Sequence, residues 1–416
     1  MSEWKPTKLD ELGFVGRGKS RHRPRNASFL YGGRYPFFQT GDIKAANFYL
    51  TEYSQTYSEE GLAQSKLWEP GTLCITIAAN IAESAILGIE GCFPDSVVGF
   101  VADPNKADVR FIKYYMEILK LQMQGVSRGT TQDNLSVEKL LTFNFLIPAL
   151  PIQQRIAGIL SAYDELIENS QRRIKILEAM ARNLYREWFV HFRFPGFENH
   201  RRVASALGEI PKGWEVATLG AHLVALESGK RPKGGIRKES EGVPSIGAEN
   251  INGIGWHEFA SEKLVPREFF EQMRKGVVRD RDVAMYKDGA YIGKSSYFRD
   301  GFPHPECCVN EHVFLLRGDR ARLKQNFLYL WLQEPDTVQT IRSKNANAAQ
   351  PGVNQQALLG MKLVLSDEKS AARFDDFVEP LLAQIINLAK RTQNLRRTRD
   401  LLLPRLLSGQ IAIEAA

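Results

Sequence analysis

A chain of 416 residues is too long for a single hydrophobic core and suits two or three domains of ordinary size. Its 43% hydrophobic and 25% charged residues are typical of a globular protein, and no stretch approaches the roughly 20 unbroken apolar residues of a membrane helix. The four cysteines are too few for a disulfide scaffold, and the first residues, MSEWKPTKLDELG, lack the apolar core of a secretory signal. We therefore expect a cytoplasmic protein with no membrane segment.

The first 149 residues predict one mixed α/β domain. Short apolar runs such as 73–78 (LCITIA) and 97–102 (VVGFVA) are typical of strands, and 109–119 (VRFIKYYMEIL) is typical of a helix. Near the start of the domain, residues 17–25 read RGKSRHRPR, with five Lys or Arg in nine positions. Cations in such a run can displace the counterions of a phosphate backbone, although a single basic run is more often a solvated loop.

A long helix is predicted from about Ile152 to Val190. Its seam residues recur in alternating steps of four and three over five heptads, which indicates a coiled coil rather than a helix packed only on its own domain. The predicted seam, mostly apolar, consists of Ile156, Leu160, Tyr163, Ile167, Ser170, Ile174, Leu177, Ala181, Leu184 and Trp188.

The segment after this helix, 193–212, is rich in Pro, Gly and polar residues and predicts a linker. Aromatic residues cluster where the helix ends, and they either pack in a core or contact a partner. These residues are Trp188, Phe189, Phe192, Phe194 and Phe197.

The second half of the chain repeats the first. Trp4 and Leu9 match Trp214 and Leu219 at an offset of 210, and the match continues at offsets of 215 to 218. A slowly growing offset is what a duplication followed by small insertions leaves behind. The second copy has its own basic run, KRPKGGIRK at 230–238, again with five Lys or Arg in nine positions. Two such runs at equivalent places favour phosphate contact over a solvated loop.

The second copy also ends in a heptad helix, in which Pro380 should kink or shift the first turns. Its predicted seam is Phe374, Val378, Leu381, Ile385, Leu388, Thr392, Leu395, Arg399 and Leu402. We therefore expect an α+β chain with two mixed α/β domains, separated by two long helices that form an antiparallel coiled coil, with a pseudo-two-fold internal repeat. The predicted segments are domain 1 at 1–149, spacer helix 1 at 150–192, the linker at 193–212, domain 2 at 213–367, and spacer helix 2 with the C-terminal tail at 368–416.

This expected geometry suits DNA that is read in two parts. A helix of about 38 residues spans about 57 Å, so basic domains at the two ends of such a rod would contact half-sites separated by unread base pairs. Because the two copies have diverged, the half-sites should differ. The expected target is therefore bipartite and asymmetric.

Three stretches of the chain resemble the specificity subunits of type I restriction-modification systems. They are IPALPIQQRIAGILSAYDELIENSQRRIKILEAMARNLYREWFVHF (147–192), GEIPKGWEVATLG (208–220) and NLRRTRDLLLPRLLSGQIAI (394–413). Together with the alternation of domain and helix, the resemblance covers essentially the whole chain. One departure from the family pattern is Ser366, which stands where the first copy has Pro148.

The resemblance implies a non-catalytic subunit with two target-recognition domains, each of which reads one half-site of double-stranded DNA. It implies that the helices dock two methyltransferase subunits, and that restriction subunits, which act as motor and nuclease, join through that core. S-adenosylmethionine, ATP and Mg²⁺ are then expected on those partners, with no cofactor and no metal in this chain.

Candidate DNA-binding residues come from the two basic runs and from the polar segment near the end of each domain. Arg, Lys, Gln and Asn contact base edges or phosphates. The candidates in the first domain are Lys19, Arg21, Arg23, Arg25, Arg128, Gln132 and Asn134. Those in the second are Lys230, Arg231, Lys233, Arg237, Lys344, Asn345, Gln350 and Asn354.

Other functions find less support in the sequence. Residues 13–20 match the Walker A pattern, but polar residues precede them and Pro24 falls where the helix should run, so we interpret them as a loop that brings backbone and a cation to a phosphate. The Asn/Asp-Pro-Pro-aromatic loop of an adenine methyltransferase is missing, and the seven histidines show no metal-like cluster. A transcriptional regulator with two fused recognition domains remains the alternative, although no helix-turn-helix spacing is evident.

Overall fold

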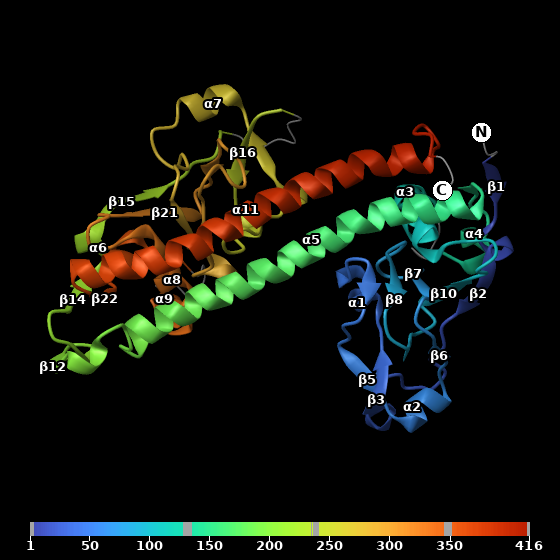
Figure 1. Ribbon diagram of the computed structural model, residues 1–416, viewed down its shortest axis with the longest axis horizontal. Helices are drawn as coiled ribbons and strands as arrows, with labels where there is room; N and C mark the ends of the chain where they lie inside the picture. Colours follow the sequence, from blue (N-terminus) through green and yellow to red (C-terminus); the bar gives the residue numbers. More distant parts are fainter. Residues whose placement is uncertain (1–3, 128–134, 234, 236–240, 345–351, 414–416) are drawn as a thin grey trace. The chain divides into compact units, whose positions relative to one another are not determined.

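The computed structural model describes residues 4–127, 135–233, 235, 241–344 and 352–413. The chain forms two compact units, unit 1 from residues 1–167 with 395–416 and unit 2 from residues 168–394. Helices α5 (Leu150–Tyr185) and α11 (Glu368–Leu407) each contribute to both units (Figure 1). The predicted boundaries at 149/150 and 367/368 fall where these two helices begin. Among the described helices, none combines the length and the apolar character needed to cross a membrane.

Unit 1 is built on two small sheets and a strand pair. The larger sheet has the order β2 (Gly13–Arg17), β10 (Val97–Ala102), β7 (Leu73–Thr76), β8 (Ser84–Leu87), β4 (Tyr49–Leu50). The smaller has the order β5 (Gln55–Tyr57), β3 (Tyr31–Phe37), β9 (Gly91–Cys92), β6 (Leu67–Trp68), and the pair is β1 (Lys5–Thr7) with β11 (Phe145–Ile147). Its other helices are α1 (Thr40–Ala45), α2 (Glu59–Ala63), α3 (Val109–Ser127) and α4 (Val137–Leu140), with 3-10 helices at Leu9–Glu11 and Ser28–Leu30.

The core of unit 1 joins the larger sheet to three helices. Apolar side chains of the strands, such as Ile75 and Phe100, pack with those of α3, such as Phe111. The beginning of α5 and the end of α11 contribute Ile156 and Leu406 to the same core. The paired helices are therefore part of this unit's hydrophobic core and are not a separate attachment.

Unit 2 repeats this plan. Its larger sheet has the order β15 (Leu223–Ser228), β21 (Val313–Gly318), β18 (Val283–Tyr286), β19 (Ser295–Tyr297), and its smaller sheet has the order β17 (Lys263–Val265), β16 (Val243–Ile246), β20 (Cys308–Val309). Two further pairs are β14 (Glu215–Thr218) with β22 (Lys362–Leu365) and β12 (Arg202–Ser205) with β13 (Gly208–Pro211). Its helices are α6 (Leu219–His222), α7 (Arg267–Glu271), α8 (Gln325–Gln333), α9 (Pro335–Ser343) and α10 (Gln355–Leu359), with 3-10 helices at Phe197–Asn199, Ala248–Asn250, Phe259–Ser261 and Gly289–Tyr291.

The strand pairings confirm the predicted duplication. In unit 1, β3 pairs antiparallel with β5 and parallel with β9. In unit 2, β16 pairs antiparallel with β17 and parallel with β20 in the same way. The closing pair β1–β11 has its counterpart in β14–β22. For the parts of the two copies that precede α5 and α11 we use the names that the resemblance implies, recognition domain 1 (4–149) and recognition domain 2 (213–367).

Helices α5 and α11 pair in opposite directions, as predicted. In unit 1, Arg399 near the end of α11 donates to Asp164 in the first half of α5. In unit 2, Trp188, in the π-helical turn Arg186–Val190 that follows α5, packs on Phe374 near the start of α11. All ten predicted seam positions of the first helix are buried or half-buried.

Two details differ from the sequence-based expectation. Pro380 does not interrupt α11. A proline has no N–H, so the carbonyl of Asp376 lacks its helical hydrogen bond. Because Pro380 lies on the exposed side of the helix, water can bond this carbonyl instead. The buried stripe of α11 is also wider than the predicted seam and includes Leu382, Ile386 and Ala389, because α11 packs on recognition domain 2 as well as on α5.

The segment predicted as a linker, 193–212, contains the β12–β13 hairpin. Of the predicted aromatic cluster, Trp188, Phe189 and Phe194 are buried in the core of unit 2, where Phe189 and Phe194 contact Trp214. Core packing is therefore the correct interpretation of these residues, because their rings are already covered within the chain.

Candidate nucleic-acid interface

Each recognition domain holds a Gly-Lys pair close to another backbone segment, which lies just after β9 in the first copy and at the end of β20 in the second. An ideal Cβ at Gly18 would lie 2.3 Å from the carbonyl oxygen of Pro94, and one at Gly229 would lie 1.5 Å from that of Val309. Only glycine allows so close an approach between two backbone segments. Lys19 and Lys230 follow with exposed side chains, so both domains present a cation from a fixed backbone position.

Hydrogen bonds fix the backbone of the first loop. The amide of Lys19 donates to the carbonyl of Phe93 over 3.1 Å, and the hydroxyl of Ser65 donates to the carbonyl of Lys19 over 2.8 Å. The chain then continues through an irregular loop and reaches its first α-helix only at Thr40. The Walker A match at 13–20 therefore lacks the helix that would hold a nucleotide phosphate.

The arginines of the first basic run have different roles. Arg23 donates to the carbonyls of Ser20 and His22 over 2.7 and 2.8 Å, and thereby shapes the loop. Arg25 forms an ion pair with Asp95, in which a single guanidinium nitrogen lies 2.9 and 2.8 Å from the two carboxylate oxygens. Arg21 is exposed and makes no ion pair or side-chain hydrogen bond with the described residues, as is also true of Lys19. These two side chains are therefore the ones available for a phosphate.

A further cation and aromatic side chain, which the sequence did not single out, lie in the same domain. The ammonium of Lys66 lies 3.5 Å from the ring centre of Trp68 and 4.8 Å from that of Phe14, whose side chain is 56% exposed. Burial and the neighbouring charge of Lys19 both lower the pKa of Lys66. Lys19 and Lys66 carry like charges and have no acidic partner among the described residues, so their surroundings favour the binding of an anion.

In recognition domain 2 the corresponding loop is partly neutralised. Arg231 forms an ion pair with Glu311 over 2.8 Å, and the Nε2 atom of His312 lies 3.2 Å from the same carboxylate. Lys230 and Lys233 are exposed and make no ion pair within the described part of the chain. The domains therefore share the position of the loop but differ in its charge pattern.

The remaining candidates divide between described and undescribed positions. Lys344 is exposed where α9 ends. The side chain of Asn354 caps α10 by accepting from the amide of Ala357 over 2.8 Å, as Ser136 caps α4 in the first copy. Arg128, Gln132, Asn134, Arg237, Asn345 and Gln350 lie outside the described residues.

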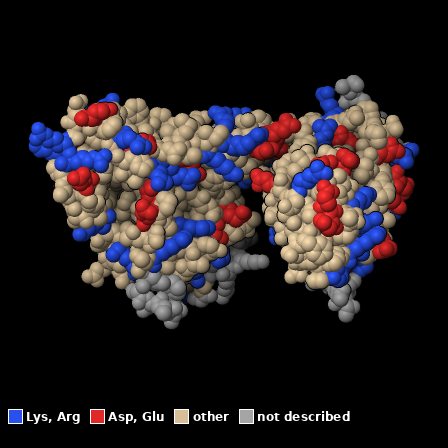
Figure 2. Space-filling model, turned by 90° about the horizontal axis from the view of Figure 1, so that it is seen from below, with Lys and Arg blue, Asp and Glu red and all other residues tan. Residues whose placement is uncertain are grey.

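Figure 2 shows Lys and Arg side chains on the visible face of both units, with Asp and Glu side chains among them. The mixture agrees with the modest net charge of +7 for the whole chain. A nucleic-acid interface on this chain would therefore depend on a few uncompensated cations, and not on a uniformly basic surface.

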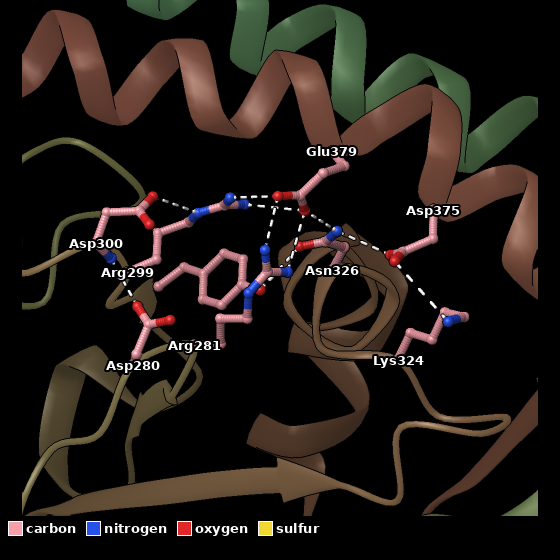
Figure 3. A network of polar contacts seen from close by, with 9 residues as sticks. Asp280, Arg281, Arg299, Asp300, Lys324, Asn326, Asp375 and Glu379 are labelled. Carbon is pink, nitrogen blue, oxygen red and sulfur yellow. Dashed lines mark hydrogen bonds and ion pairs between the residues drawn. The ribbon is translucent and has the colours of Figure 1, made fainter.

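An ion-pair network fastens recognition domain 2 to α11 (Figure 3). Glu379 of α11 accepts from Arg281 over 2.7 Å, from Arg299 over 2.6 Å and from Asn326 over 2.8 Å. The side chain of Arg299 is only 2% exposed. Burial by itself would raise the pKa of Glu379, but the hydrogen bonds from these three residues outweigh it and lower the pKa to about 2.

Recognition domain 1 is fastened to α5 by different residues. Tyr114 of α3 donates to Asp164 over 2.5 Å. Gln153, which is buried in the first turn of α5, donates to the carbonyls of Lys106 and Pro148 over 2.9 and 3.0 Å. Each domain is thus attached to its own long helix by specific polar contacts, and this fixes the orientation of its surface with respect to that part of the helix.

One grouping contradicts the sequence-based expectation that the histidines form no metal-like cluster. The fold brings His257 and His304 to the carboxylate of Glu262. Glu262 and His304 are 42 positions apart in the sequence, so a search for short motifs does not find this grouping.

Comparisons with known proteins agree with this fold. A family model described as the type I restriction modification DNA specificity domain matches residues 1–179. The chain is 23% identical to the type I restriction enzyme MjaIX specificity subunit of Methanocaldococcus jannaschii over 99% of this chain and 94% of that protein. It is 22% identical to the HindI specificity subunit of Haemophilus influenzae over 99% of this chain and the whole of that protein. The crystal structure of a type I restriction-modification S subunit from M. genitalium shares the fold, with a TM-score of 0.60 and 16% identity over 97% of this chain and 96% of that one.

Proposed function

We propose that this chain, which resembles type I restriction enzyme specificity subunits over nearly its whole length, is such a subunit and reads an asymmetric, two-part DNA sequence, one part with each recognition domain. The observation that carries the proposal is the duplicated Gly-Lys loop, which presents Lys19 and Lys230 from equivalent positions of two otherwise diverged domains. Equivalent loops with different surroundings suit a common way of holding the backbone and a different sequence for each domain.

In this proposal the free cations position the DNA and other side chains read it. Lys19, Arg21 and Lys66 in the first domain, and Lys230 and Lys233 in the second, would contact phosphates, since they lack acidic partners among the described residues. Phosphate contacts set the register of a protein on the duplex, whereas polar groups at the base edges supply specificity. Arg23, Arg25 and Asn354 would act indirectly, because their side chains hold the loops in shape.

The long helices would carry the partners. The resemblance to type I specificity subunits implies assembly with methyltransferase and restriction subunits. Exposed apolar side chains on α5, among them Ile176 at 60% and Met180 at 50% exposure, and Phe377 on α11 at 51%, support a docking role for these helices. We propose that two methyltransferase subunits dock here, one for each copy, and that the restriction subunits join through them. S-adenosylmethionine, ATP and Mg²⁺ would then be bound by those subunits and not by this chain.

Selection from a random DNA library by the complex of this chain with its methyltransferase subunits tests the proposal. We expect two defined, unequal blocks of bases at a fixed separation. A single uninterrupted block, or a palindrome, would contradict it. The regulator alternative predicts specific binding without any methyltransferase subunit, so co-purification of such a subunit with the full chain separates the two functions.

A further inference from the structure

Two histidines and a glutamate from separate segments of recognition domain 2 converge on one point. The Nε2 atoms of His257 and His304 each lie 2.5 Å from Oε1 of Glu262, and the three possible ligand atoms all lie within 4.8 Å of one another. We propose that these three side chains form a binding site for a divalent transition-metal ion, and that zinc is the ion whose ligand preference they match.

The sheet topology explains why these residues meet. Lys263 of β17 and Cys308 of β20 both pair with Ser245 of the central strand β16, from its two sides. Glu262 immediately precedes β17, and His304 lies in the connection that leads into β20, so the segments that carry them flank β16. The 3-10 helix Phe259–Ser261 then turns the chain so that His257 faces Glu262.

The surroundings hold the two imidazole rings in place. The ring of Phe259 contacts that of His257 edge-on at 4.6 Å between centres, and that of His304 at 5.6 Å. The side chain of His257 is 1% exposed, so its ring has no access to water. The carboxylate of Glu262 accepts a hydrogen bond from each of the two rings. Oriented rings and a carboxylate are what a metal site needs before the ion arrives.

The ligand chemistry selects the metal. Two imidazole nitrogens with one carboxylate oxygen form a set that zinc prefers, whereas Mg²⁺ and Ca²⁺ prefer oxygen ligands alone. Bonds of about 2.0–2.2 Å to zinc require the three atoms to separate slightly from their present positions. His304 is on a connecting segment and is 23% exposed, so it can make this adjustment. Three protein ligands leave a fourth position for water on the exposed side of His304.

Among the described residues, such a grouping occurs in the second domain alone. In recognition domain 1, Ser54 precedes β5 at the place where Glu262 precedes β17. An ion bound by His257, Glu262 and His304 would tie the start of β17 to the segment before β20. Because Val309 at the end of β20 backs Gly229, the ion would also stiffen the support of the Gly-Lys loop in this domain.

Metal analysis of the purified full chain tests the site directly. After dialysis against micromolar zinc and then metal-free buffer, we expect about one zinc ion per chain by plasma mass spectrometry. Cobalt in place of zinc should give the visible absorption bands of a four-coordinate ion. His304→Ala should weaken zinc binding by more than about 100-fold, since loss of outer-sphere partners alone costs 10- to 100-fold. His191→Ala, which changes an exposed histidine outside the site, should bind zinc like the unmodified chain.

Glu262→Gln provides a second test, because it keeps the shape of the side chain and removes its charge. Circular dichroism of both variants shows whether the fold is retained. Loss of zinc from folded His304→Ala or Glu262→Gln supports the site. An unmodified chain that holds no zinc after this dialysis, or a His304→Ala chain that still holds one equivalent, overturns it.

Discussion

Replacement of Glu379 by glutamine tests whether the network in Figure 3 holds recognition domain 2 on α11. The carboxylate has its pKa lowered from 4.5 to about 2, a difference that corresponds to roughly 3.4 kcal/mol at about 1.36 kcal/mol per pKa unit. Since 32% of the Glu379 side chain is exposed, solvent screens part of this energy. We therefore expect Glu379→Gln to lower the free energy of unfolding by about 2 kcal/mol, because Arg299 stays buried without its charged partner.

Thermal unfolding of the full chain measures this effect. For a unit of this size, about 2 kcal/mol corresponds to roughly 4–8 °C in the Tm of the transition that includes unit 2. Asp376→Asn is the matched control, since Asp376 is an exposed acid on the same helix without an ion pair among the described residues. A depressed folded-state pKa stabilises the protein above pH 4.5, and this stabilisation is lost as the pH falls towards 2. The Tm difference between Glu379→Gln and the unmodified chain should therefore shrink between pH 6 and pH 3. A shift no larger than that of Asp376→Asn, or a shift independent of pH, would refute the reasoning.

Two other variants, one double and one single, test the first Gly-Lys loop. Lys19→Ala combined with Arg21→Ala should reduce the slope of log affinity for DNA against log salt by about 1.8, at roughly 0.9 for each lost phosphate contact, as measured by fluorescence anisotropy. Arg34→Ala is the control and should leave the slope unchanged, because the exposed charge of Arg34 is already paired with Glu59. An unchanged slope in the double variant would show that this loop does not contact the DNA. Gly18→Ala should cost about 1–3 kcal/mol of stability by urea unfolding, because its Cβ meets backbone carbonyls, whereas Gly158→Ala has open space around the new Cβ and should not destabilise. Equal stability of the two variants would show that the loop can move away at no cost.

The parts of the fold that the sequence predicts are those with a long-range pattern. The heptad seam could be read because a period of 3.5 persisted over both helices, and the internal repeat could be read because the same spacings occurred twice. The burial of Ile386 and Ala389 could not be read from the seam, because it arises from packing against a domain whose position no local pattern encodes.

The candidate site shows the same limit. Lys19 and Lys230 were accessible to prediction because duplication marked them as equivalent. Lys66 was not, since only the folding of β2 and β6 beside one another brings it to Lys19 and Phe14. Glu379 likewise has partners 53, 80 and 98 residues away, and no short motif connects them. Residues such as Arg25 and Asn354 were sound candidates by type, but their contacts within the chain could be known only from the structure.

The central claim is that the two recognition domains read DNA independently, and exchange of one domain tests it most directly. Residues 1–148 would be replaced by the matching domain of a relative, and the hybrid would be expressed with the methyltransferase subunits of this system. Sequencing that detects methylated bases in the host genome then gives the recognised motif. The account predicts that one block of the motif changes while the other block remains as in the parent. A hybrid in which both blocks change, or in which neither does, would contradict it.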